Sequence, residues 1–371
     1  MLSHNEKDLS QSNPTTSDGR AMKLTKIETH PGITILHHVE RDGSLWATRG
    51  RTILKGNPSR GWQPLAQFPR AYPRDLFSFS RPSARAMRAD KANIFVNRAG
   101  EVLGIRAGVV YAIDPSGDIK SRLSIQGDSV LHGGICEDEQ GWTYFGEYFM
   151  NPARGEVRIF RLDPMLESWE VAHVFPAGEV RHIHGIYRDP YDDQALWVTS
   201  GDALGECYLY RTRDRFETLD RIGEGTQTWR AVRLFFTEKY VCWLTDSQLE
   251  QNRSCRWDRE RDQLEVGQHL DAPAWYGSTT AEGLHLAFTT VEPGPAVHRN
   301  TAAIYASKDA FNWKEITCFQ KDAWRPMKLF KYGVISCPSG MMSQDAFYIS
   351  GEGLRGLDGV SATLRIEVEG P

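Results

Sequence analysis

The chain contains 371 residues, of which 40% are hydrophobic and 25% charged, with a formal net charge of -4. This length allows a large buried core. The acidic balance excludes the basic surface that nucleic-acid binders need, and no apolar run is long enough to span a bilayer. The six cysteines form no close pair of the kind found in zinc sites, and the polar N-terminus does not resemble a signal peptide. We therefore expect reduced thiols, a cytoplasmic location, and neither nucleic acid nor a membrane as a partner.

The first 22 residues are polar and rich in Ser, Asn, Asp and Thr, a composition typical of a disordered tail. From residue 23 to residue 371, short stretches of alternating apolar and polar residues follow one another between turn residues. No window shows a convincing helical period. The pattern predicts a single all-β domain over residues 23–371.

The strand patterns recur in units of four. Two loose units cover residues 33–68 and 92–125, and residues 70–91, which contain five arginines, are predicted to form an inserted loop between them. The clearer units begin, in chain order, near His132, near His182, and at Trp229, Trp275 and Trp324. The three tryptophans lie 46 and 49 residues apart, a spacing typical of β-propeller blades. The sequence predicts a β-propeller of seven four-stranded blades, or of six if the loose second unit is not a blade.

The turns between third and fourth strands carry a recurring motif. The octapeptide from Thr212 to Leu219, Thr-Arg-Asp-Arg-Phe-Glu-Thr-Leu, resembles the Asp-box, Ser/Thr-x-Asp-x-Gly-x-Thr-Trp, of the sialidase-like BNR-repeat propellers. It departs from that pattern at the Gly and the Trp, and copies of altered length occur at residues 161–169 and 307–313. The resemblance implies a propeller in which each Asp caps a hairpin turn on the blade rim. The Phe/Tyr-Arg-Ile-Pro segment of sialidases is missing, so we expect a related rather than a true sialidase activity.

In propellers, the starts of the innermost strands and the ends of the second strands meet at one mouth of the central channel, the default place for a site. The predicted strand starts carry His132, His182, His184, Trp229, Arg230, Trp275, Tyr276, Trp324 and Arg325. The predicted second-strand ends carry Arg49, Glu147, Tyr148, Asp202, Asp246, Glu292 and Ser339. Imidazoles, carboxylates, guanidiniums and aromatic rings are therefore expected to converge on one concave surface.

The histidines are the first candidates for chemistry. His182 and His184 are two residues apart on a strand and so share a face. Together with His132 they could transfer protons, bind a divalent metal as a cofactor, or only hydrogen-bond to one another inside the channel. The sequence leaves these three alternatives open.

The acidic candidates are Glu147, Asp202 and Asp246, which could act as the acid and the base or nucleophile of glycoside hydrolysis, or could be solvated rim residues. Tyr276 is a further candidate nucleophile.

The substrate-binding candidates are cationic and aromatic. Arg230 and Arg325 could clamp a ligand carboxylate or pair with the protein's own carboxylates. Tyr148, Trp229 and Trp275 could stack on a sugar, although tryptophans at the repeat period could equally pack between blades.

Three functions fit these residues. The first is a carbohydrate-active enzyme, namely a glycosidase acting on an acidic sugar or polysaccharide at the channel mouth. The second is a metal-dependent or histidine-dependent polysaccharide lyase acting on uronic acids, in which a histidine abstracts the proton next to the carboxylate. The third is a propeller that binds a glycan or a protein without catalysis. For both enzyme functions the expected ligand is a carbohydrate. We expect it to be anionic if Arg230 and Arg325 bind its carboxylate.

Overall fold

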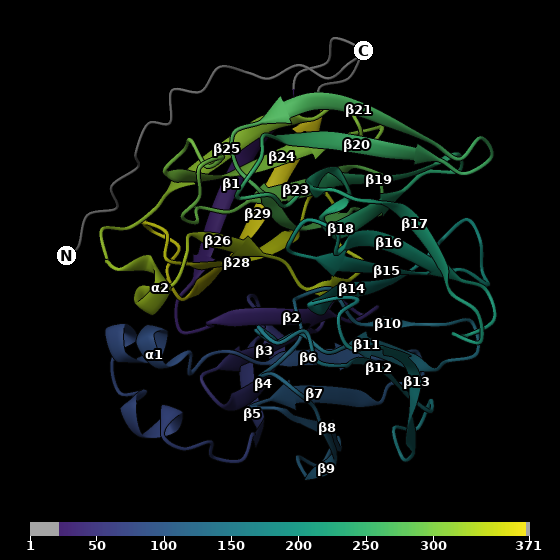
Figure 1. Cartoon of the computed structure of the whole chain (residues 1–371). Helices are drawn as coiled ribbons and strands as arrows, with labels where there is room; N and C mark the ends of the chain where they lie inside the picture. The colour runs from purple at the N-terminus through teal and green to yellow at the C-terminus, as the bar shows by residue number, and fades with distance from the viewer. Residues whose placement is uncertain (1–21, 369–371) are drawn as a thin grey trace.

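The computed structural model describes residues 22–368, which form seven sheets arranged as the blades of a β-propeller (Figure 1). Within each blade the four successive strands are antiparallel. The predicted all-β propeller is therefore confirmed, and the loose second unit is a complete blade. Of the predicted tail, residues 1–22, only Met22 belongs to the described residues, and it begins the first strand.

The first four blades follow the chain from the inner to the outer strand. Blade one consists of β2 (Ile35–Val39), β3 (Leu45–Arg49), β4 (Thr52–Asn57) and β5 (Gly61–Gln67), with the short β27 (Ser339–Gly340) parallel to β2. Blade two consists of β6 (Asn93–Val96), β7 (Val102–Arg106), β8 (Val109–Ile113) and β9 (Ile119–Ser124). Blade three consists of β10 (Cys136–Glu137), β11 (Thr143–Gly146), β12 (Val157–Leu162) and β13 (Trp169–Phe175). Blade four consists of β14 (His182–Arg188), β15 (Leu196–Gly201), β16 (Cys207–Thr212) and β17 (Asp220–Gly225).

The remaining blades complete the ring. Blade five consists of β18 (Ala231–Phe236), β19 (Tyr240–Thr245), β20 (Asn252–Asp258) and β21 (Gln263–Leu270), preceded by the 3-10 turn η2 (Gln227–Trp229). Blade six consists of β22 (Ala274–Thr279), β23 (His285–Thr289), β24 (Thr301–Ser307) and β25 (Lys314–Gln320). Blade seven consists of β26 (Val334–Ser336), β28 (Phe347–Glu352), β29 (Val360–Val368) and β1 (Met22–His30).

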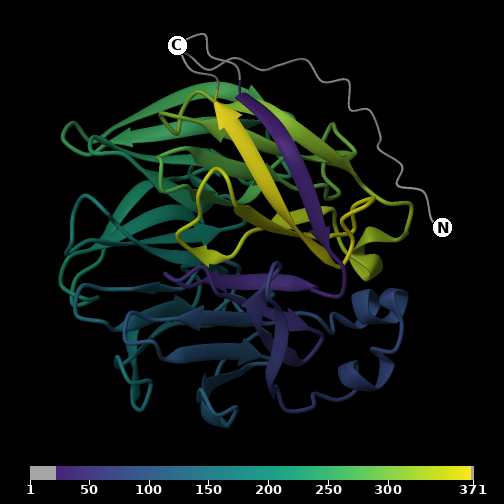
Figure 2. The ribbon, with the colours of Figure 1, turned by 180° about the vertical axis from the view of Figure 1, so that it is seen from behind.

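The N-terminal strand closes the ring. β1 is the outer strand of blade seven and runs antiparallel to β29, from Met22 opposite Val368 to His30 opposite Ser361. Figure 2 shows the two strands side by side, purple against yellow. The last blade is therefore built from both ends of the described chain, which the sequence repeat did not reveal.

Two segments outside the blades lie together near the channel mouth. The inserted segment, residues 70–91, contains the 3-10 turn η1 (Arg74–Phe77) and the short helix α1 (Arg81–Met87). The connecting segment, residues 321–333, lies between β25 and β26 and contains α2 (Met327–Phe330). Figure 1 shows α1 close to α2, and the Nη2 of Arg85 donates a hydrogen bond to the carbonyl of Phe330. No helix among residues 22–368 is long and apolar enough to cross a membrane.

The prediction that Trp324 and Arg325 begin an innermost strand is wrong, because the inner strand of blade seven begins only at Val334. The side chain of Asp322 accepts a hydrogen bond from the backbone N–H of Trp324, which turns the chain here. Pro326, which follows, has no N–H to give to a ladder. The tryptophan therefore matched the repeat spacing without occupying the equivalent position.

The hairpin turns of the motif are capped by their aspartates. The carboxylate of Asp214 accepts hydrogen bonds from the backbone N–H and the hydroxyl of Thr218 (2.9 and 2.6 Å). The carboxylate of Asp309 accepts from the N–H groups of Phe311 and Asn312 (3.0 and 2.8 Å). These carboxylates satisfy backbone donors that the tight turns would leave unpaired. The turns thus have a structural role away from the channel.

Tryptophans fill the space between blades four and five. Trp197 and Trp243 are 1% and 0% exposed, and Trp197 meets Trp257 edge to face at 5.7 Å between ring centroids. Trp229 packs in the same cluster, 5.3 Å from the ring of Trp243. Large aromatic rings suit this position because they bury much apolar area with few rotatable bonds. Of the two alternatives for Trp229, packing between blades is the one the structure supports.

We predict that Trp197→Ala lowers the free energy of unfolding by about 3 to 5 kcal/mol, because it leaves a large cavity between blades. Trp169→Ala is the matched control, since Trp169 is 44% exposed on the outer strand β13 and its loss should cost about 1 kcal/mol or less. Urea unfolding followed by circular dichroism would measure both. Equal losses would show that this inter-blade contact is not a principal source of stability.

Candidate active site

A cavity of about 350 Å³ opens at the mouth of the channel and collects most of the predicted residues. Its wall includes His132, Tyr148, His184, Asp202, Arg230, Asp246, Trp275, Tyr276 and Glu292. They come from blades three to six, where innermost strands begin and second strands end, the arrangement expected from the sequence. Residues up to 160 positions apart in the chain therefore meet on one surface.

Besides His182, which lies behind the cavity wall, three predicted site residues lie elsewhere. The carboxylate of Glu147 is fully buried and accepts hydrogen bonds from Arg158 and from the backbone N–H of Gln126, so it fastens blade three to the loop before it. Trp229 belongs to the inter-blade cluster. Arg325 is exposed outside the cavity wall, and its Nη1 donates to the carbonyl of Trp324 (3.3 Å). None of the three is placed to touch a ligand in this cavity.

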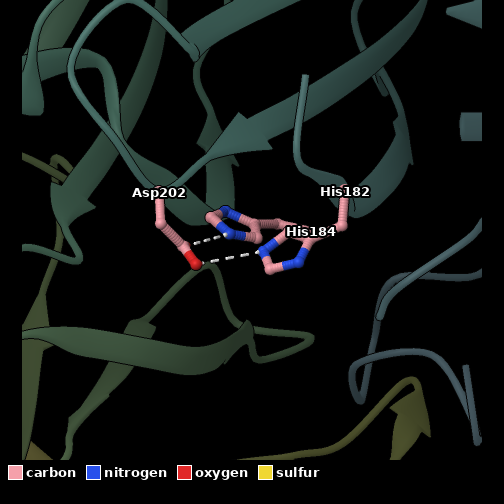
Figure 3. A group of neighbouring side chains, drawn as sticks. All are labelled: His182, His184 and Asp202. Carbon is pink, nitrogen blue, oxygen red and sulfur yellow. Dashed lines mark hydrogen bonds and ion pairs between the residues drawn. The ribbon is translucent and has the colours of Figure 1, made fainter. Parts of the chain in front are cut away.

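Asp202 is the centre of a charged group that we name the Asp202 cluster: Asp202, His182, His184, Arg181 and Arg230. Figure 3 shows Asp202 with its two histidines. Its Oδ1 accepts from Arg230 (3.0 Å) and lies 3.1 Å from Nε2 of His184. Its Oδ2 accepts from Arg181 (2.7 Å) and lies 3.4 Å from Nε2 of His182. Burial alone would raise the pKa of Asp202, but the two histidines and Arg230 outweigh it and hold the pKa well below its usual range. The carboxylate is thus ionised and fixed.

Backbone carbonyls orient both imidazoles. Nδ1 of His182 lies 2.8 Å from the carbonyl of Phe149, and Nδ1 of His184 lies 2.9 Å from the carbonyl of Ala231. Nε2 of each ring faces Asp202, so each imidazole lies between two acceptors, a backbone carbonyl and a carboxylate oxygen. Burial lowers the pKa of His182 despite the nearby carboxylate. The ring of His182 sits behind the cavity wall rather than in it.

A metal ion does not fit this group well. The donor atoms of His182, His184 and Asp202 lie within 4.8 Å of one another, the only such group among the residues that the structure describes, and His132 is not part of it. However, both oxygens of Asp202 already bind guanidinium groups, those of Arg181 and Arg230. A divalent cation would add a third positive centre beside these two. We therefore regard the cluster as a set of ion pairs that shapes the wall.

Two further carboxyl groups form the carboxyl side of the cavity, namely Asp246 and Glu292. Asp246 forms an ion pair with Nη2 of Arg230 (3.3 Å). The side chains of Asp246 and Glu292 are both largely buried. Burial, followed by the charge of Asp246, raises the pKa of Glu292 to about 8, against the opposing effect of Arg230. Burial also raises the pKa of Asp246. Glu292 is thus a carboxylic acid that keeps its proton at neutral pH.

Unsatisfied polar atoms mark the carboxyl side as a place for a ligand. Oδ1 of Asp246, Oε1 of Glu292 and Nε1 of Trp275 are buried and have no hydrogen-bond partner among residues 22–368. The indole N–H of Trp275 lies near both carboxyl groups without good hydrogen-bond geometry to either. Buried polar atoms without partners are costly, so native proteins usually keep them only where something else satisfies them.

Another part of the cavity wall is the cation side, which we define as Arg88, Lys91 and Lys331 beside His132. Burial lowers the pKa of His132 to about 4, with Glu352 opposing the shift and Lys91 and Lys331 adding to it. The imidazole is therefore neutral at physiological pH and free to accept a proton. The cavity wall thus presents both a base and an acid.

The phenol groups of the cavity stay protonated. Burial and the neighbouring Tyr148 raise the pKa of Tyr276 well above its usual value. Burial, followed by the charges of Asp202 and Asp246, does the same for Tyr148. Neither residue supplies a phenolate, so Tyr276 is poorly suited to the role of nucleophile considered above. Their rings remain available as apolar walls, with Tyr276 meeting His132 at 5.7 Å between centroids.

Sequence reasoning missed the cation side altogether. Lys91 and Arg88 end the inserted segment, and Lys331 lies in the connecting segment, so none of them belongs to the repeat that located the mouth. The five arginines of residues 70–91 were the available signal, since so many cations in one short insertion need partners. The sequence pattern placed Glu292 at the mouth, where the structure has it, but it did not predict the raised pKa of this residue.

Fold and site together define a seven-bladed β-propeller with a charged, titratable cavity at the channel mouth. No family model matches the chain, and no curated protein sequence does. The solved structures that it resembles include the virginiamycin B lyase of Staphylococcus aureus, at a TM-score of 0.58 and 14% identity over 93% of this chain and 99% of that one. An oligogalacturonate lyase in complex with manganese gives a TM-score of 0.54 at 8% identity, over 97% and 96% of the two chains. YCF48 bound to a D1 peptide gives 0.54 at 10% identity, over 97% and 100%.

These identities are so low that the likeness shows the fold alone. The neighbours are β-propellers that include two lyases and a peptide-binding protein. The resemblance of the turn motifs to the sialidase-like BNR propellers finds no support in a sequence match, and the chain shares with those proteins the propeller architecture.

We predict that Asp202→Asn lowers the free energy of unfolding by about 3 to 5 kcal/mol at pH 7, because it leaves Arg230 and Arg181 without their shared anion. The pKa of Asp202 is depressed, so its contribution is complete above the ordinary carboxyl pKa of about 4 and fades as the pH falls below it. Denaturant titrations at several pH values would test this.

The matched control is Asp220→Asn, which breaks the ion pair of an exposed aspartate (62% exposed) with Arg211 and should cost under about 1 kcal/mol. A loss for Asp202→Asn no larger than this control, or one that does not diminish in acid, would contradict the assignment.

Proposed function

We propose that the protein is a carbohydrate-active enzyme that cleaves an acidic sugar chain by β-elimination at the channel mouth, with His132 as the base and Glu292 as the acid. The observation that carries the proposal is that one cavity wall holds two groups with opposite pKa shifts. His132 is neutral at a pKa of about 4, and Glu292 is protonated at a pKa of about 8. Environments that push two titratable groups apart in this way are typical of acid and base assignments.

The chemistry follows from these two groups. A ring nitrogen of His132 takes the proton from the carbon next to the substrate carboxylate, and the electrons of that C–H bond form a carbon–carbon double bond. The bond from the neighbouring carbon to the glycosidic oxygen breaks, and Glu292 gives its proton to the departing oxygen. The cations beside His132 favour this route, because negative charge develops on the substrate carboxylate as the proton leaves.

Hydrolysis is the second candidate. It is favoured by the two carboxyl groups Asp246 and Glu292, which together resemble the acid and the partner carboxylate of a glycosidase. Its weakness is that burial raises the pKa of Asp246, which makes that carboxyl a poorer base or nucleophile. Among the structural neighbours, two propellers are named as lyases, which agrees with elimination on this fold.

We predict that His132→Ala reduces the rate of elimination on a uronic-acid oligosaccharide by about 100-fold or more, the usual contribution of a general base. His298→Ala is the control, because His298 is exposed and does not line the cavity. Ultraviolet absorbance of the new double bond would follow the reaction. Release of reducing ends without that absorbance would assign hydrolysis instead, and binding without either product would leave a non-catalytic propeller.

We also predict a bell-shaped dependence of kcat/KM on pH. The acid limb should lie near pH 4, where protonation of His132 removes the base, and the alkaline limb near pH 8, where ionisation of Glu292 removes the acid. In Glu292→Gln the alkaline limb should disappear along with most of the activity. An unchanged alkaline limb in that variant would assign the limb to another group.

A further inference from the structure

We propose that Lys91 is the primary contact of an oxyanion-binding subsite on the cation side of the cavity, which holds the carboxylate or phosphate of a sugar ligand next to His132. The inserted segment and the connecting segment build this subsite over the mouth. The assignment deepens the proposed function by naming where the acidic group lies, and it rests on that function only for the statement that the ligand is a sugar.

The cations around the cavity differ in whether the protein already neutralises them. Lys331 forms an ion pair with Glu352 (2.9 Å). Arg81 binds Asp358 (3.0 Å) and Asp90 (2.5 Å), and Arg74 binds Asp128. The ammonium of Lys91 forms no hydrogen bond or ion pair with any of residues 22–368, although it is partly buried in the cavity wall. Arg88 and Lys328 also line the cavity without an ion pair among residues 22–368, but both are exposed to solvent. Lys91 is therefore the partly buried cation that is left for a ligand.

The surroundings of Lys91 are positive overall. Burial lowers its pKa to about 8, and Lys331, Arg88 and Arg74 add to the effect, against Asp128 alone. Asp128 is itself engaged by Arg74. Holding an ammonium near other cations in a partly desolvated wall is unfavourable, and a bound anion would relieve it. A lysine ammonium is a point charge that accepts either a carboxylate or a phosphate, so the shared chemistry is that of an oxyanion.

The position of Lys91 directs the anion toward the base. Its Nζ lies 5.7 Å from the ring centroid of Tyr148, and its charge acts on His132, whose pKa it helps to lower. Lys91, Tyr148 and His132 line the same cavity. An oxyanion bound to Lys91 would therefore sit within the cavity beside His132, as elimination next to a carboxylate requires.

The supporting structure is rigid. The side chain of Arg85 in α1 is completely buried, donates to Asp322 (2.5 Å) and to the carbonyl of Phe330, and stacks on Trp324 at 4.5 Å. These contacts clasp the inserted segment to the connecting segment. At the end of the inserted segment, the backbone N–H of Lys91 donates to the carbonyl of Arg88 (3.2 Å), and β6 begins two residues later. The backbone that carries Lys91 is thus held in place before a ligand arrives, which reduces the entropic cost of binding.

Calorimetric titration of the whole protein with monomeric galacturonate, monomeric glucuronate and inorganic phosphate tests the subsite. None of these probes has a glycosidic bond, so turnover does not interfere, and neutral galactose serves as the uncharged ligand. We expect Lys91→Met to weaken binding of the anions at least tenfold, Lys91→Arg to restore part of it, and galactose to be unaffected. Lys120→Met, on the exposed outer strand β9, is the matched control and should bind as the unmodified protein does.

The outcomes separate the subsite from the catalytic proposal. Binding of a uronate or of phosphate that depends on Lys91 supports the subsite, and the tighter of the two identifies the source of the oxyanion. Anion binding that Lys91→Met leaves unchanged, in a variant with normal circular dichroism, overturns it, as does failure of all three anions to bind. Lys91-dependent binding without elimination on any oligosaccharide would retain the subsite and reject the proposed function.

Discussion

The pairing of β1 with β29 is the constraint on which the rest of the molecule depends. A blade of four strands buries its faces only against its neighbours, so seven blades have no free face only when the ring is complete. The ladder that completes it joins residues 22–30 to residues 361–368. The distances across the mouth, such as that between His132 of blade three and Glu292 of blade six, are consequently properties of the closed ring rather than of any one blade.

The cavity owes its chemistry to an uneven distribution of charge. Arg181 and Arg230 both pair with Asp202, and Arg230 is at the same time the counter-ion of Asp246. One guanidinium, that of Arg230, therefore acts on three carboxyl groups, since it also opposes the pKa shift of Glu292. Glu292 therefore keeps its proton. On the cation side the cations outnumber nearby carboxylates, and His132 stays unprotonated. The pKa values of His132 and Glu292 are shifted in opposite directions for the same reason. A partly desolvated wall disfavours the charged form of any group that lacks a partner of opposite charge.

Much of this architecture could be predicted from the sequence, for reasons that can be stated. The period of the tryptophans and the alternation of apolar residues are local properties, and they led to the propeller, to its seven blades and to a mouth containing His132, His184, Asp202, Asp246 and Tyr276. Ring closure by β1 could not be predicted, because an isolated strand pattern carries no information about its partner 330 or more residues away.

The same limit explains the errors at the site. Trp324 had the right spacing but sits before the strand, where Asp322 turns the chain. Glu147 had the right position at the end of a strand, but its side chain turns toward Arg158 instead of the channel. The direction of a side chain at a strand end depends on neighbours from other blades. Lys91 was missed because an insertion has no counterpart in the repeat.

The contacts of Arg85 with Asp322 and Phe330 affect the order in which the parts of the protein become folded. Asp322 is 237 positions away from Arg85, and contacts of such high sequence separation are among the slowest to form in a chain. A chain whose blades have already assembled would still lack the contact between the inserted segment and the connecting segment over the cavity. If Lys91 binds an oxyanion as proposed, such immature copies would not yet bind it, and binding would arise only with the native topology.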